Sequence, residues 1–264
     1  MKFIMTEETN ASESEVQITP VEASVLLSGA EWDPKLLATT LAQEWEITVP
    51  EKDLPADASE SLVFEAEGAV IAVKLFEEPL PAEMARMHAA MNPLWPQAGA
   101  MAQLHRAHLA VAAIPKTASL VEAAQVLVKV VSSLCNQPSA LAIDTGSTIL
   151  GTDGYREGAT VMKGGELPLF NLVTFAIAKA DETNFVAFTM GMSFLGHNEL
   201  EIAPTAEKPE VIQEFLYTVA SYTLKTGKGL RDGQILGLHP EKAQTVRYAE
   251  SSMIPGLKTM QITL

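Results

Sequence analysis

The stretch from Asn184 to Ile202, NFVAFTMGMSFLGHNELEI, decides the fold. It begins as an apolar run, passes Gly191 and Gly196, and ends in an alternation of polar and apolar residues that carries Glu199 and Glu201. This pattern is typical of a buried strand that meets a tight turn and returns as a half-exposed strand. We therefore predict a hairpin within a sheet, with the two acids on its solvated side.

The composition is that of a globular protein, with 264 residues of which 47% are hydrophobic and 19% are charged. No apolar run reaches the roughly 18 residues of a membrane-spanning helix, and the N-terminus lacks a secretory pattern, so we expect a cytoplasmic protein with no membrane contact. The net charge is −15, with most of the acidity in the first 60 residues. Nucleic acid is therefore not expected as a partner, whereas the acidity favours solubility or a protein partner with a basic surface.

Residues 1–22 are rich in Glu, Ser and Thr, and they predict a disordered acidic tail. An N-terminal α+β lobe is expected over residues 23–150. Its predicted elements are a strand at 23–28, a helix at 34–46, strands at 61–66 and 69–76, a helix at 83–91, a strand at 105–114, a helix at 119–135 and a strand at 140–143. The order strand, helix, two strands, helix, strand fits a ferredoxin-like first lobe.

Residues 151–168 hold five glycines and predict a connecting loop. The C-terminal α+β lobe, residues 169–264, is expected to begin with a strand at 170–178 that pairs with the central hairpin. A helix over 208–226 should face the sheet with Val211, Phe215, Val219, Tyr222 and Leu224. The predicted fold is thus α+β, with two lobes of mostly antiparallel sheet and helices packed on one face.

Several segments together resemble a family of proteins known as domain of unknown function 4261. They are Pro79–Pro81 before a helix, Trp95-Pro96 after it, the run from His105 to Val111, the helix 121–131, the run Met190–Ile202, and Asp232-Gly233 before a short strand. One departure is Ala142-Ile143-Asp144, where the family is expected to carry aromatic residues. The resemblance implies an α+β fold and a bacterial source, and it implies no activity.

The sequence Asp144-Thr145-Gly146-Ser147 follows two apolar residues and resembles the active-site turn of aspartic proteases. In those enzymes two carboxylates about 3 Å apart share a proton and activate water. Asp144 would need a second copy of the chain to supply the other carboxylate. The alternative interpretation is a strand that ends in an Asx-type turn, and the α+β pattern favours this interpretation.

His197, Glu199 and Glu201 are spaced two residues apart, so on a strand they would lie on the same face. There they could bind a divalent metal or act as acid and base. A row of charges on a solvated edge strand is the more frequent explanation. Of His105 and His108, one is expected to be buried and to donate to a carbonyl, and the other to be exposed. The single cysteine, Cys135, lies on an apolar helix face and is interpreted as inert packing.

These patterns contain no cofactor fingerprint and no complete metal-ligand set, so no cofactor or metal is expected. We therefore predict a non-catalytic protein-binding module, such as an immunity, regulatory or accessory factor. The alternative is a hydrolase that uses Asp144, or a metal held near His197, Glu199 and Glu201. Nothing in the sequence indicates an oligomeric state.

Overall fold

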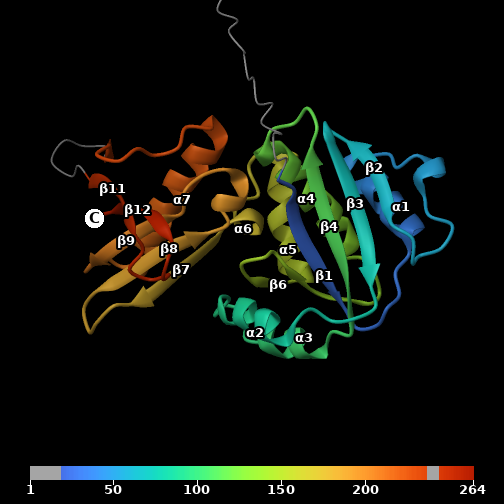
Figure 1. The fold of residues 1–264 in the computed structure, drawn as a ribbon, viewed down its shortest axis with the longest axis horizontal. Helices are drawn as coiled ribbons and strands as arrows, with labels where there is room; N and C mark the ends of the chain where they lie inside the picture. Colours follow the sequence, from blue (N-terminus) through green and yellow to red (C-terminus); the bar gives the residue numbers. More distant parts are fainter. Residues whose placement is uncertain (1–18, 237–243) are drawn as a thin grey trace, which may run out of the picture.

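The computed structural model describes residues 19–236 and 244–264, and these form an α+β fold with two six-stranded sheets (Figure 1). A disordered tail was predicted for residues 1–22. Residues 1–18 of it lie outside the described residues, and the first strand begins at Val21. None of the helices in the described ranges combines the length and the apolarity that crossing a membrane requires.

The first sheet is built from six antiparallel strands in the order β2-β3-β4-β1-β5-β6. These strands are β1 (Val21–Leu27), β2 (Leu62–Ala66), β3 (Ala69–Phe76), β4 (Ala107–Pro115), β5 (Ala140–Asp144) and β6 (Ile149–Gly151). The ferredoxin-like pairing is not confirmed, because that unit would place β1 beside β3, whereas β4 lies between them. After helix α3 (Ala98–Leu104) the chain enters the centre of the sheet as β4, between β1 and β3.

The second sheet has the order β10-β11-β12-β9-β8-β7. Its strands are β7 (Thr174–Lys179), β8 (Phe185–Met190), β9 (Leu200–Thr205), β10 (Ile235–Leu236), β11 (Gln244–Glu250) and β12 (Lys258–Ile262). Only β12 and β9 run parallel. The predicted hairpin is confirmed as β8 and β9, but β9 is an interior strand between β8 and β12, so its prediction as an edge strand is wrong.

The helices follow local signals at several of their ends. They are α1 (Pro34–Trp45), α2 (Ala82–Ala90), α3 (Ala98–Leu104), α4 (Leu120–Leu134), α5 (Thr152–Ala159), α6 (Leu169–Leu172) and α7 (Pro209–Thr226), with 3-10 turns η1 (Glu51–Asp53), η2 (Thr160–Gly164) and η3 (Ser193–Leu195). The Asp33 carboxylate caps α1, and Ser119 and Glu122 form a capping box at α4. Gly227 ends α7 with a positive φ of 66°.

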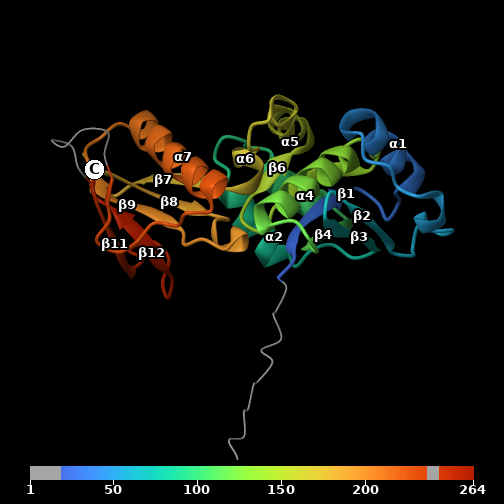
Figure 2. The same ribbon diagram turned by 90° about the horizontal axis from the view of Figure 1, so that it is seen from above.

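The helices cover the two sheets differently. In Figure 2, α1, α5 and α7 lie on the same side of the sheets. One apolar core joins the helix-covered faces of both sheets, from Val25 in β1 through Leu127 in α4 to Ile202 in β9 and Leu216 in α7. The first sheet also carries α2 and α3 on its other face, where Leu26 and Ala142 belong to a second, smaller core. Coverage of one face alone, as predicted, therefore holds for the second sheet only.

The segment between the sheets is more regular than its glycines indicated. Residues 151–168, predicted as a loop, form α5 and η2. Helix α3, strand β6 and the short helix α6 were also not predicted, because each is shorter than a reliable periodic pattern. The strand predicted to begin at residue 170 begins at Thr174, after α6.

Helix α7 matches its predicted buried face in part, because Leu224 is buried and Phe215 and Val219 pack against the core as expected. Its buried residues are Ile212, Leu216, Ala220, Thr223 and Leu224. Val211 and Tyr222, which were expected to face the sheet, are 46% and 53% exposed. Two apolar stripes run along this helix, so helical periodicity alone could not distinguish the one that faces the core.

We predict that Gly191→Ala destabilises the protein by about 2 kcal/mol or more. Gly191 has a φ of 117°, and an added Cβ would lie 2.4 Å from the carbonyl oxygen of Leu172, so the substitution combines backbone strain with a clash. The matched control is Gly154→Ala, in α5, where nothing lies within 4 Å of the added Cβ; it should stabilise the helix by about 0.5–1 kcal/mol. Urea unfolding of the two variants measures both changes, and equal stabilities would contradict the described turn.

Candidate functional site

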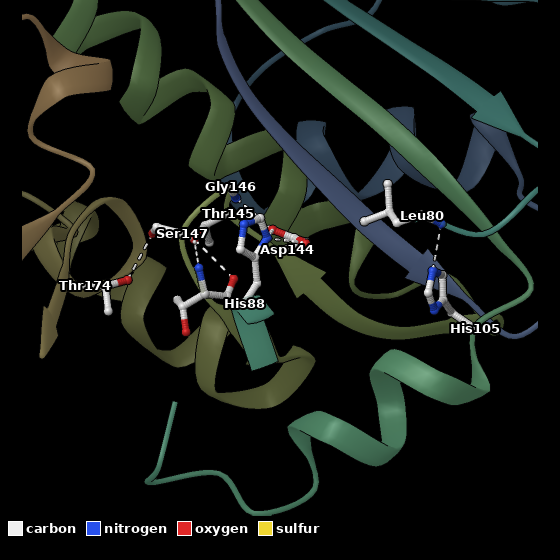
Figure 3. A network of polar contacts seen from close by, with 9 residues as sticks. Leu80, His88, His105, Asp144, Thr145, Gly146, Ser147 and Thr174 are labelled. Atoms are coloured by element: carbon white, nitrogen blue, oxygen red, sulfur yellow. Dashed lines mark hydrogen bonds and ion pairs between the residues drawn. The ribbon is translucent and has the colours of Figure 1, made fainter. Parts of the chain in front are cut away.

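A groove opens where the two sheets end beside each other. The last strand of the first sheet is β6, and the last strand of the second sheet is β7. A cavity of about 520 Å³ is lined by residues of both, including Leu150 and Gly151 on one side and Thr174 and Phe175 on the other. The sheets meet at this point through side chains, because the hydroxyl groups of Ser147 and Thr174 are 3.0 Å apart (Figure 3).

The rim of the groove is apolar and unusually exposed. Leu94, in the loop between α2 and α3, is 89% exposed, and Phe170 of α6 is 55% exposed. The Phe170 ring packs against the rings of Phe175 and Tyr217, with centroids 5.7 and 5.3 Å away. Trp95 lies against Gly151, where an added Cβ would come within 3.2 Å of the indole. Exposed apolar side chains gathered along a cavity are typical of a binding surface.

Two polar side chains lie buried beside this groove. Within the described residues, Thr148 Oγ1 and Asn171 Oδ1 have no hydrogen-bond partner. The other side-chain atom of Asn171, Nδ2, donates to the carbonyl of Tyr155 at 2.8 Å. A buried acceptor left unpaired costs about 1–3 kcal/mol. Asn171 Oδ1 lies against Gly158, where an added Cβ would come within 2.5 Å of it.

The wall that carries Leu94 is held by a buried pair of side chains. His88 of α2 and Asp144 at the end of β5 are in contact, with His88 Nδ1 2.9 Å from both carboxylate oxygens (Figure 3). The backbone N–H of Gly146 also donates to Asp144 Oδ1, at 2.8 Å, across a turn in which Gly146 has a φ of 81°. With Asp144 ionised, His88 Nδ1 is the donor. The pair fixes α2, and the loop that follows it, to the first sheet.

The surroundings of Asp144 differ from those of the paired carboxylates in an aspartic protease. Its carboxylate is buried, and its hydrogen-bond partners are the ring of His88 and the N–H of Gly146. Among the described residues no second carboxylate forms a hydrogen bond to it. The N–H contact two residues ahead is the Asx-type turn that the alternative interpretation predicted.

Glu199 does not lie on a solvated face, so that prediction is wrong. Its carboxylate is buried and accepts hydrogen bonds from the hydroxyl groups of Thr189 and Ser193 at 2.8 Å, and from the N–H groups of Gly191 and Ser193 at 3.0 and 2.9 Å. The turn after β8 leaves several backbone donors without strand partners, and the carboxylate satisfies them. Glu199 therefore shapes the turn.

Glu201 is also buried, and it faces a different set of donors. The N–H and hydroxyl of Ser252 donate to it at 3.0 and 2.6 Å, and the hydroxyl of Thr259 donates at 3.0 Å. Burial alone would raise the pKa of Glu201, but hydrogen bonds from Ser251, Ser252 and Thr259 outweigh it and hold the pKa below its usual value. The carboxylate ties the segment after β11 to the centre of the second sheet.

The structure does not bring together the three side chains considered as a metal site. Glu199 and Glu201 are each occupied by separate donors, and His197 is half-buried beside Gly229. In the part of the chain that the structure describes, no three His, Cys, Asp or Glu side chains converge as ligands. Burial lowers the pKa of His197.

The two histidines and the cysteine that the sequence singled out are packed against the interior of the fold. His105 and His108 are both buried, and each is 2.6–2.9 Å from a carbonyl through Nδ1, whereas one of them was expected to be exposed. His105 Nε2 also accepts from the N–H of Leu80 (Figure 3), and burial lowers its pKa. Burial raises the pKa of the Cys135 thiol to about 12, which leaves almost no nucleophilic thiolate at neutral pH.

Sequence reasoning missed the groove itself. Its walls come from the loop after α2, from β6 and α5, and from α6 and β7. No single spacing connects these segments, and β6 and α6 were not predicted. His88 and Asp144 are 56 positions apart in the sequence, so no local motif predicts that they pair.

We predict that Glu201→Gln lowers the free energy of unfolding by about 2 kcal/mol near neutral pH, because charge-assisted hydrogen bonds are lost. The folded-state pKa lies below the ordinary value of 4.5, so this stabilisation is present above about pH 4.5 and is lost as the pH falls through the folded-state value. The difference between wild type and variant in urea unfolding should therefore shrink on acidification. The exposed Glu214→Gln control should stay within about 0.5 kcal/mol of wild type, and a Glu201 difference that is independent of pH would refute the account.

Comparisons with known proteins find a family model that matches the C-terminal part of the chain. No curated protein and no solved structure matches the chain. The family model named Domain of unknown function (DUF4261) matches residues 188–263, which include β9, α7 and the strands that follow them, whereas Asp144 and most of the groove lie before this range. Over residues 188–263 the chain is therefore a match to the domain of unknown function DUF4261, the family that its sequence resembles.

Proposed function

We propose that this chain is a non-catalytic protein-binding module that takes an apolar segment of a basic partner in the groove between its two sheets. The observation that carries the proposal is the rim of the groove, where Leu94 and Phe170 are largely exposed beside a cavity of about 520 Å³. Covering these side chains would remove apolar surface from water at about 25 cal/mol per Å².

The position of the rim favours a polypeptide over a small molecule. Leu94 lines the cavity and is 89% exposed, so a small ligand inside the cavity would leave much of this side chain in water. A polypeptide segment continues past the cavity on both sides, so it can fill the space between β6 and β7 and also cover the rim.

The negative charge of the chain favours a partner polypeptide that is basic. The net charge is −15, and the one charged side chain among the described residues that line the groove is Asp153. A field of this sign repels acidic partners and increases the association rate of basic ones. The partner segment should therefore combine apolar side chains with Lys or Arg.

The alternative, a hydrolase that uses Asp144, has less support. A general base must reach the proton that it abstracts, whereas the Asp144 carboxylate is buried between His88 and the N–H of Gly146. The surroundings of Asp144 favour a role in supporting the groove wall.

The proposal predicts the outcome of a selection from a random 12-residue peptide display library. Enriched peptides should carry apolar residues together with Lys or Arg. Their affinity, measured by calorimetry with synthetic peptides, should fall at least about tenfold for Phe170→Ala, because truncating an aromatic hot-spot residue costs about 2 kcal/mol or more.

The matched control is Tyr248→Ala, an aromatic residue on β11 with 47% exposure against 55% for Phe170. It lies toward the opposite edge of the second sheet and should leave the affinity unchanged. A selection that yields no consensus, or peptides that bind Phe170→Ala as tightly as wild type, would contradict the proposed function.

A further inference from the structure

We propose that the partner segment binds in an extended conformation as an added strand on the free edge of β7, so that the second sheet gains a seventh strand. This inference rests on the proposed function and specifies its mode. The evidence comes from the position of β7 in its sheet, from the direction of its backbone groups, and from the side chains beside it.

Strand β7 is an open edge, and its residues 174–178 carry no device that blocks pairing. It pairs with β8 on one side, and it is the last strand in its sheet. Its residues 174–178 read TFAIA, and the first charge is Lys179 at the end of the strand. Exposed edges of this length and apolarity usually carry a charge, a proline or a bulge that prevents association. Their absence from residues 174–178 fits an edge that is meant to be paired.

The alternation of the ladder shows which backbone groups are free. The N–H of Ala180 donates to the carbonyl of Asn184, at 2.9 Å, and the two residues continue the register of β7 with β8. Bonded and non-bonded pairs alternate in an antiparallel ladder, so Ala178 and Ala176 bond to β8. The N–H and C=O groups of Phe175 and Ile177 then point away from β8, toward the free edge.

The side chains beside this edge give the added strand a preferred face. Phe175 and Ile177 pack toward the core on the side of α7, next to the exposed rings of Phe170 and Tyr217. Residues directly opposite each other in a sheet share a face. The partner residues paired with Phe175 and Ile177 should therefore be apolar, whereas the alternating residues face away from α7 and can carry the basic charges.

The other edge of the groove does not offer the same template. Strand β6 has three residues, and the carbonyl of its first residue, Ile149, already accepts from Asn92 Nδ2 at 2.9 Å. A second copy of this chain is also a poor occupant, because pairing two chains that each carry a charge of −15 is opposed by like-charge repulsion. These points favour a basic strand from a different protein, bound on β7.

The test uses wild-type protein and the tightest peptide from the display selection, resynthesised with a single N-methyl group at each successive backbone position. An added strand donates its N–H groups to the β7 edge from every second residue. Methylation should weaken binding at least about tenfold at those alternate positions and less than about threefold at the positions between them. Calorimetry measures each affinity, and the unmodified peptide is the reference.

The outcomes separate the binding mode from the proposed function. A peptide whose affinity depends on Phe170 but shows no alternation with N-methylation would overturn strand addition and leave the protein-binding function standing. A selection that yields no binder would overturn both. Sedimentation of the protein alone tests whether a second copy occupies the edge. A concentration-dependent dimer that the peptide dissociates would identify a second copy as the occupant and overturn the proposal of a basic partner.

Discussion

The two sheets of this protein lie side by side without joining, and the proposed function depends on that constraint. Hydrogen bonds between β6 and β7 would have made one continuous sheet. Instead the sheets share an apolar core on their helix-covered faces, and at their adjacent edges they meet through the hydroxyl groups of Ser147 and Thr174. Each edge therefore keeps backbone groups that a ladder would have used, and the cavity between them is accessible to a ligand.

Buried carboxylates hold loops of both sheets in place, and one of these loops is a wall of the groove. Asp144 binds His88 and so holds α2, with the exposed loop that follows it, against the first sheet. Glu199 satisfies the turn after β8, and Glu201 ties the segment after β11 to the second sheet. All three accept several hydrogen bonds, and a buried charge is tolerated only with such partners. The acids that resembled catalytic groups in the sequence have surroundings suited to shaping loops.

Local signals predicted much of the fold, and long-range contacts account for the errors. The cap at Asp33, the capping box of Ser119 and Glu122, and the hairpin around Gly191 could each be recognised from neighbouring residues. The burial of Glu199 and Glu201 could not, because an alternating strand looks the same whether its polar side meets water or a shell of donors. The groove also escaped prediction, because residues as distant as Leu94 and Phe175 are brought together only by the order of the strands.

Amide hydrogen exchange along β7 in the free protein, followed by NMR, tests the open edge most directly. The account predicts fast exchange at Phe175 and Ile177, whose N–H groups point to the free edge, and slow exchange at Ala176 and Ala178, which bond to β8. Equal protection of all four amides would mean that the edge is already paired in the free protein. That result would contradict the claim on which the binding site is built.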